Sequence, residues 1–286
     1  MEQQTAMSKL SDRITTSIGS LIRQVFSETE KQAAAHLAGT RGFDTKCVTV
    51  MIVAALSLVF TQYFGIRPGY RMLADLLGSL HFTSWSRDIL QWVEASGNTQ
   101  IHRLLYWVCI IVAFYICFPA LVIKLFLKQK LRDYGFGLGN SFKHYWIYGL
   151  IAVVMIPLVI VFSFSPRFQQ VYPFYKLAQG ESLYPYFWVW QVLYLVQFIA
   201  VEFFFRGFIL HGLKYRFGYY AIAIMVIPYC MIHFGKPMPE AIGAIFAGLA
   251  LGVLSLATRS IWMGVIVHYF VGFTMDIAAV WHRGLL

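Results

Sequence analysis

Apolar residues in this chain gather in long blocks that are separated by short polar segments. Most blocks hold about 16 to 25 residues, enough for a helix to cross the hydrocarbon core of a bilayer. In lipid every backbone N–H and C=O must be satisfied within its own segment, so the blocks are expected to be helices. They predict an all-α fold, a polytopic transmembrane helix bundle of about seven spans: 47–64, 104–127, 145–164, 186–210, 219–234, 241–257 and 261–280, of which 219–234 is the weakest.

Two amphipathic segments lie outside these blocks. In residues 1–46, apolar side chains recur at helical spacing: Leu10, Ile14, Ile18, Leu21 and Val25. This pattern predicts a helix that lies on the membrane surface or packs on the bundle. Residues 70–100 hold a second such stretch, in which Trp85 and Trp92 favour an interfacial position.

The chain is therefore expected to divide into three regions. Residues 1–46 form a cytoplasmic or interfacial segment, residues 47–180 an N-terminal transmembrane region, and residues 181–286 the core that carries the chemistry. Within the core, Ala244, Gly248 and Gly252 form a stripe of small residues, which allows close helix packing. We expect that stripe to serve packing inside the bundle, with a dimer face as the alternative.

Composition supports the membrane assignment. Hydrophobic residues make up 59% of the 286 positions and charged residues 13%, against about 45–50% and about 25% in soluble domains. The net charge of +10 does not indicate nucleic-acid binding, because the basic residues lie at the span ends, as the positive-inside rule requires. Most of them lie on the side of the N-terminus, which predicts a cytoplasmic N-terminus. The absence of a targeting signal and the compact bundle favour a prokaryotic cytoplasmic membrane, with the endoplasmic reticulum as the alternative. His211 and His282, near span ends, are expected at the interface.

A few ionisable residues fall inside the predicted spans, where they are costly and indicate a function. Glu202 and Arg206 are four residues apart, so they lie on one helix face and can pair. His233 ends the 219–234 block, and the last block holds His268 with Asp276 about two turns further on. At about 1.5 Å per residue, Glu202, His233 and His268 lie roughly 13–21 Å from the span ends. The three side chains are therefore expected to meet in the middle of the bundle.

This set of residues has the chemistry of peptide hydrolysis. A carboxylate beside an imidazole can hold a water and take its proton. A second imidazole can donate to the oxyanion that forms when the water attacks a carbonyl, and Arg206 would keep Glu202 ionised. The same ligands could form a His₂Glu zinc site. We favour the site without metal or other cofactor, because the chain has no HExxH motif and the pairing of Glu202 with Arg206 competes with metal ligation.

At these residues the sequence resembles the CAAX-protease and bacteriocin-processing (CPBP, formerly Abi) family of intramembrane endopeptidases, over roughly residues 185–280. The signatures of that family are EExxxR, FxxxH and Hxxx(N/D). The first is similar to the run from Val201 to Arg206, the second to the run from Tyr229 to His233, and the third begins at His268.

Two positions depart from the family pattern. Val201 stands where the first glutamate of the pair would be, and Gly272 stands where the Asn or Asp would be. Asp276, one turn beyond Gly272 on the same face, is a candidate substitute. Lys236 and Glu240 flank the site and are candidate accessory residues that set the loop.

The resemblance implies cleavage of prenylated CAAX tails, leader peptides or membrane-anchored sorting tails that reach the site from the lipid bilayer. It implies that Glu202 and His233 activate the water while His268 stabilises the oxyanion. The alternative from another class is a catalytically silent membrane scaffold that binds a partner, which the departures at Val201 and Gly272 favour. A transporter is weaker, because the chain shows no repeated halves.

Overall fold

The computed structural model describes residues 2–40, 42–66, 69–94, 99–178 and 180–285. These residues form helices and connecting turns and include no strand. Six helical segments are long and apolar enough to cross a membrane: Thr45–Gly65, Thr99–Phe126, Ser141–Ser163, Tyr186–Phe217, Met238–Thr258 and Trp262–His282. Each corresponds to one of the predicted blocks, so the all-α, polytopic character of the fold is confirmed.

The remaining block, 219–234, differs from the prediction. Its helix, α11 (Tyr220–Met231), has 12 residues and is about 18 Å long, well short of a bilayer core about 30 Å thick. A turn follows the helix directly, with the amide of His233 donating to the carbonyl of Cys230. The count of about seven spans therefore included one segment whose helix is too short to span.

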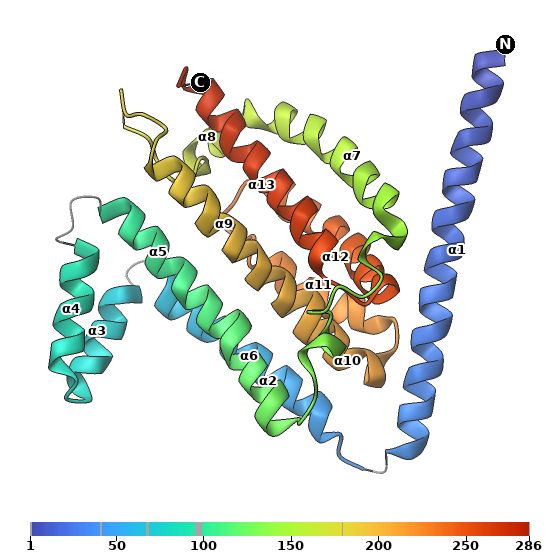
Figure 1. Cartoon of the computed structure of the whole chain (residues 1–286), viewed down its shortest axis with the longest axis horizontal. Coiled ribbons are helices and arrows are strands. Elements are labelled where there is room, and N and C mark those ends of the chain that lie inside the picture. Colours follow the sequence, from blue (N-terminus) through green and yellow to red (C-terminus); the bar gives the residue numbers. More distant parts are fainter. Residues whose placement is uncertain (1, 41, 67–68, 95–98, 179, 286) are drawn as a thin grey trace.

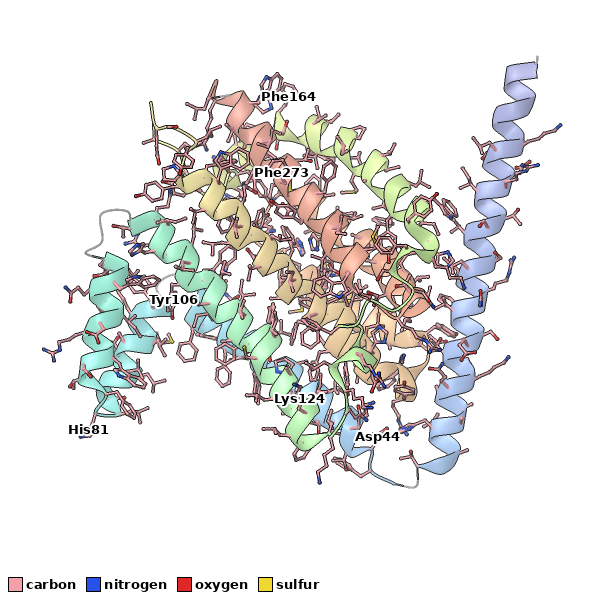
Figure 2. All side chains as sticks on the ribbon, viewed as in Figure 1. Asp44, His81, Tyr106, Lys124, Phe164 and Phe273 are labelled. Carbon is pink, nitrogen blue, oxygen red and sulfur yellow. The ribbon has the colours of Figure 1, made fainter. Side chains whose placement is uncertain are left out.

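The bundle has two ends, which we name after residues that Figure 2 labels: the Asp44 end and the Phe164 end. One continuous helical segment joins them through the middle, formed by α9 (Tyr186–Glu202), η6 (Phe203–Ile209) and α10 (Leu210–Phe217). In its most apolar window 67% of the residues are buried, against 39% or less in the other spans. The charged residues of the predicted site therefore lie on the most enclosed helix of the molecule.

Other spans enclose this central segment. In Figure 1, α5 (Thr99–Val112) and α13 (Trp262–His282) lie on either side of α9, and α7 (Tyr145–Ser163) lies beyond α13. The span Thr99–Phe126 continues through η2 (Ala113–Cys117), α6 (Phe118–Leu121) and η3 (Val122–Phe126). Because α5 packs on α9 and α7 packs on α13, helices from both sides of residue 180 share one core. The three-region division itself stays a prediction.

Helices α11 and α12 (Met238–Thr258) pack closely against each other. A Cβ atom at Gly248 would lie 2.8 Å from Cγ2 of Val226, and one at Gly252 would lie 2.9 Å from Cγ2 of Ile222. The glycines of the small-residue stripe therefore serve packing inside the bundle, as the sequence predicted.

The helices α1, α3 and α4, in the N-terminal part of the chain, are not among the spans. The second half of α1 (Glu2–Gly39) packs on α10 and α12 and buries Leu21, Val25 and Ala33, while its first half stands apart from the other helices (Figure 1). The helices α3 (Gly69–Ser79) and α4 (Thr83–Glu94) pack against each other, with His81 at the tip of the pair (Figure 2).

Candidate functional site

The site begins where the central segment passes from α-helix to π-helix. Glu202 is the last residue of α9, and Arg206 lies in η6, a seven-residue π-helical stretch. Both side chains are fully buried, and Nη1 of Arg206 lies 3.0 Å from Oε1 of Glu202. A π turn adds a residue to the helical repeat and is frequent at functional sites. The expected ion pair between the two residues is therefore present.

His268 joins the pair from α13. Its Nδ1 lies 2.8 Å from the same Oε1 of Glu202. A carboxylate that faces Arg206 accepts hydrogen bonds, so the Nδ1 of His268 carries the proton and donates it. The other ring nitrogen, Nε2, is then an acceptor, and the hydroxyl of Tyr229 lies 3.4 Å from it. One oxygen of Glu202 is thus held from two helices.

Tyr229 in α11 is a member of the site that the sequence analysis treated only as a variant of a motif position. Its ring lies under the guanidinium of Arg206, with 3.8 Å between Cζ and the ring centroid, and its hydroxyl donates to His268. A cation over an aromatic face is stabilising, more so when both are desolvated. The signal that could have found this residue is the hydroxyl in an otherwise apolar stretch.

His233 lies next to this group without touching Glu202. Its Nδ1 is 2.8 Å from the backbone oxygen of Tyr229, and because a carbonyl only accepts, Nδ1 is the protonated nitrogen. The Nε2 of His233 is then the nitrogen that remains for other contacts. The histidine that contacts Glu202 directly is therefore His268, and the predicted role of His233 in activating the water with Glu202 stays a prediction.

The second oxygen of Glu202, Oε2, is buried and has no hydrogen-bond partner among the described residues. It faces Gly264 in α13, where an added Cβ atom would lie 2.9 Å from it. The absence of a side chain at position 264 therefore leaves room beside the one carboxylate oxygen that neither Arg206 nor His268 holds.

Asp276, the first of the candidate accessory residues, lies apart from the group of Glu202, Arg206 and His268. Asp276 is fully buried and accepts from the Trp190 indole at 2.8 Å, the Gln191 amide at 2.9 Å and the Phe174 backbone N–H at 3.3 Å. These bonds tie α13 to the start of α9 and to the loop before it. Asp276 is therefore not brought to Glu202, and it does not substitute for the family residue at 272.

Lys236 and Glu240 form a pair of their own. Nζ of Lys236 lies 2.7 Å from Oε1 of Glu240, and the hydroxyl of Tyr172 donates to Glu240 at 2.8 Å. The nearby carbonyl of Gly235 accepts from Arg167 at 2.6 Å. These contacts hold the loop between α11 and α12 at the Phe164 end, which fits the expected role of setting the loop.

The glycine at position 272, one of the two departures from the family pattern, has a structural explanation. A Cβ atom on Gly272 would lie 2.6 Å from the ring of Phe198 and 3.1 Å from Tyr194. The Phe198 ring packs on His268, with 4.3 Å between the centroids. An aromatic side chain from α9 thus fills the space that a side chain at 272 would take. Val201, the other departure, is buried in the apolar core.

A zinc site would need three ligands in one group. Within the described part of the chain no group of three or more His, Cys, Asp or Glu residues could hold a metal ion. Glu202 and His268 come together, but the third ligand of the His₂Glu alternative does not join them. We therefore derive no step through a metal.

His211 departs from its expected interfacial position. It is 1% exposed, and its Nε2 lies 3.1 Å from Oγ of Ser255 in α12. The continuation of the central segment through α10 buries it, because α1, α2 (Thr45–Phe60) and α11 all pack on α10. His282, in contrast, is half-buried at the Phe164 end, where Oγ of Ser163 lies 2.8 Å from its Nε2.

One comparison with known proteins gives a match. A family model described as type II CAAX prenyl endopeptidase Rce1-like matches residues 183–274. This range includes Glu202, Arg206, Tyr229, His233 and His268, and it confirms the resemblance drawn from the sequence. Comparisons with curated proteins and with solved structures give no match.

Proposed function

We propose, on the premise that residues 183–274 belong to the Rce1-like family of CAAX endopeptidases, that this membrane protein is an intramembrane endopeptidase. Its substrates are lipidated or membrane-anchored peptide tails, which reach the bundle from the bilayer. The observation that carries the proposal is the buried group of Glu202, Arg206 and His268, joined at a single carboxylate oxygen.

This group is charged and buried, which is an unfavourable way to pack helices together. Breaking a buried charge pair costs about 3–5 kcal/mol, whereas well-packed apolar residues in its place are often as stable or more so. Apolar residues would therefore lock the helices at least as well as these three side chains. Their presence indicates a chemical role.

In the proposed mechanism, Glu202 is the general base. Arg206 and His268 hold Oε1, and Oε2 takes a proton from the attacking water. The hydroxide adds to the carbonyl carbon of the scissile peptide bond and forms a tetrahedral intermediate. When the C–N bond breaks, the proton on Glu202 passes to the departing nitrogen, which leaves a carboxylic acid and an amine.

The two histidines have different roles in this proposal. His268 positions Glu202 through its Nδ1–H. His233 donates its Nδ1–H to the Tyr229 carbonyl, which leaves its Nε2 able to accept a hydrogen bond. The Tyr229 hydroxyl, which donates to His268 in the free protein, turns in the reaction to donate to the developing oxyanion. This assignment revises the one that the family resemblance implies, in which His268 stabilises the oxyanion.

The test is a cleavage assay with purified full-length protein in neutral detergent. A library of prenylated and transmembrane-anchored peptides is incubated with the wild type, Glu202→Gln, His268→Ala and His233→Ala, each with and without a strong zinc chelator. We expect cleavage by the wild type and a loss of about 10²-fold or more in Glu202→Gln. We expect no effect of the chelator.

Three other outcomes have defined meanings. Cleavage that survives Glu202→Gln would remove Glu202 as the base. Loss on chelation, restored by zinc, would move the activity to a metal site. Peptides that bind with equal affinity to the wild type and to Glu202→Gln but stay intact across the library would favour the silent scaffold, which the filled position at Gly272 supports.

We also propose that the Asp44 end faces the cytoplasm of a prokaryotic cell. The support is the concentration of lysines and arginines on the N-terminal side of the spans, which the positive-inside rule associates with the cytoplasm. Single cysteines placed at Lys143 and at Ser182 in a chain without its own cysteines test this. A membrane-impermeant thiol reagent applied to intact cells is expected to label position 182 and not position 143.

A further inference from the structure

A second group of charged side chains lies at the Asp44 end, outside the catalytic group. Lys46 comes from the start of α2, Lys214 from α10, and Arg259 from the residue after α12. Nζ of Lys46 and of Lys214 lie 4.6 and 5.0 Å from the centroid of the same ring, that of Tyr215. Lys46 and Arg259 are both close enough to Lys214 to act on its charge. Two elements therefore place lysines at one aromatic ring, and a third adds Arg259 near enough to act on Lys214.

Among the described residues none of these three cations has a carboxylate partner, and Lys214 is the buried one, while Lys46 is partly buried and Arg259 is exposed. Lys214 is only 7% exposed, and its one hydrogen-bond partner is the neutral Nδ1 of His211, at 3.2 Å. In the described ranges no carboxylate lies within 4.0 Å of Lys46, Lys214 or Arg259. Asp44, beside Lys46 in the chain, is bound instead to His36 and to the amide of Cys47.

The surrounding structure only partly compensates this charge. The acidic side chains that act on Lys214, Asp133 and Glu28, are both exposed. The C-terminal end of a helix stabilises a nearby cation by about 0.3–1 kcal/mol, while burying an unpaired ion costs several kcal/mol. The buried charge of Lys214 is therefore only partly compensated by the chain, and an anion from outside the chain would compensate the rest.

The backbone conformation of Arg259 also favours a bound anion. This residue has φ 54° and ψ 34°, the left-handed conformation, which glycine adopts with least strain after a helix. An arginine there costs conformational energy, and its exposed side chain adds a positive charge near Lys214. A bound anion would offset both costs.

We propose that Lys46, Lys214 and Arg259 form a binding site for a phosphate group at the Asp44 end of the bundle. Lysine binds phosphate as a point charge, and a tetrahedral phosphate can accept from several directions, as cations from three elements require. The site lies at the ends of three candidate spans, where membrane-spanning helices meet lipid headgroups. The phosphate can belong to an anionic phospholipid or be free in solution.

This site is linked to the catalytic group. Nε2 of His211 lies 3.1 Å from Oγ of Ser255, and that hydroxyl donates to the backbone oxygen of Arg206 at 3.4 Å. Because His211 accepts from Lys214 through Nδ1, its Nε2 is the protonated nitrogen and donates to Ser255. A phosphate that holds Lys214 therefore also fixes the η6 stretch that carries Arg206.

The test is thermal unfolding of the delipidated full-length protein in neutral detergent. Phosphatidylglycerol, phosphatidylcholine or inorganic phosphate is added in increasing amounts, and the apparent affinity follows from the rise in Tm. We expect a saturable rise with phosphatidylglycerol or inorganic phosphate. In Lys214→Met the apparent affinity is expected to fall about tenfold or more, equivalent to about 1.4 kcal/mol.

A matched control removes the same charge outside the group. Lys143, exposed at the same end of the bundle, is changed to Gln, and this variant is expected to respond as the wild type does. A response to phosphatidylglycerol alone identifies a lipid headgroup as the source, and an equal response to inorganic phosphate identifies a free phosphate. An equal rise with phosphatidylcholine, or an unchanged response in Lys214→Met, would overturn the proposal.

The Tm without ligand distinguishes a binding group from a packing group. Because Lys214 is an unpaired buried cation, Lys214→Met is expected to raise the Tm in neutral detergent while weakening the response to the anion. A variant with a lower Tm in detergent and a full response to phosphatidylglycerol would show that Lys214 serves packing only.

Discussion

Two carboxylates, Glu202 and Asp276, are both fully buried in the bundle, yet their surroundings differ. Asp276 has three neutral donors shared between its two oxygens. Glu202 has two charged or ionisable partners on one oxygen, while the other has no partner among the described residues. A buried carboxylate whose oxygens are both bound holds structure together, and one with a free oxygen can accept a proton.

The largest expected effect separates these two residues by activity. Glu202→Gln removes the proton acceptor, so cleavage per folded molecule is expected to fall about 10²–10⁴-fold. Asp276→Asn keeps the shape but places an amide N–H against donors, which costs about 1–3 kcal/mol of stability and leaves the activity of the folded fraction unchanged. Cleavage rates and thermal unfolding of both variants check this. Equal losses of activity in the two variants would show that Glu202 and Asp276 do not differ in function.

A second variant tests the charge pair at Glu202. Arg206→Gln leaves a buried carboxylate without its cation and is expected to cost about 3–5 kcal/mol. The control is Arg71→Gln, which breaks the exposed pair with Glu94 and is expected to cost at most about 1 kcal/mol. Tm measurements on both variants compare them. A small cost for Arg206→Gln would mean that water reaches the pair.

Two glycines sharpen the comparison on the α13 side. Gly264→Ala would bring Cβ to 2.9 Å from Oε2 of Glu202, and a displaced base is expected to lower the cleavage rate up to about 10²-fold. Gly272→Ala meets the Phe198 ring instead and is expected to cost about 1–3 kcal/mol of stability. Adding Phe198→Ala should restore room at position 272, and Tm values of the single and double variants measure this.

The hydroxyl of Tyr229 has a smaller expected effect. Tyr229→Phe keeps the ring under Arg206 but removes the donor to His268. A hydrogen bond of about 0.5–1.5 kcal/mol corresponds to a fall in the cleavage rate of about 2- to 12-fold. The rate should fall through kcat with little change in KM, because in the proposed reaction this hydroxyl turns from His268 to the oxyanion. A wild-type kcat in Tyr229→Phe would exclude the hydroxyl from the reaction.

The smallest effect concerns Lys176, a cation whose charge acts on Asp276. Burial, and then the charge of Arg283, lower the pKa of Lys176 to about 8. Because this pKa is below the unfolded value of about 10.4, the folded state binds the proton less tightly. The destabilisation is full below about pH 8 and disappears as the pH rises through about 10.4. Tm is therefore expected to rise over this range in the wild type, relative to Lys176→Met.

The pairing of Glu202 with Arg206 could be predicted from the sequence, because a spacing of four residues places two side chains on one helix face. The choice between His233 and His268 as the partner of Glu202 could not. The estimated depths of roughly 13–21 Å are too coarse to choose between them, and only the rotation of α11 and α13 about their axes decides which ring faces the carboxylate. The packing of Phe198 against Gly272 could not be predicted for the same reason, since Phe198 lies on another helix.

The sequence by itself determined the helical class, six of the seven predicted spans and the segment that carries the charged residues, because lipid requires long apolar helices and makes each buried charge conspicuous. Tertiary structure alone decided the short length of α11, the π winding at Arg206, the separation of Asp276 from Glu202 and the burial of His211 and Lys214. These depend on which surfaces of different helices meet. A contact between two helices that are distant in the chain leaves no periodic pattern in the sequence.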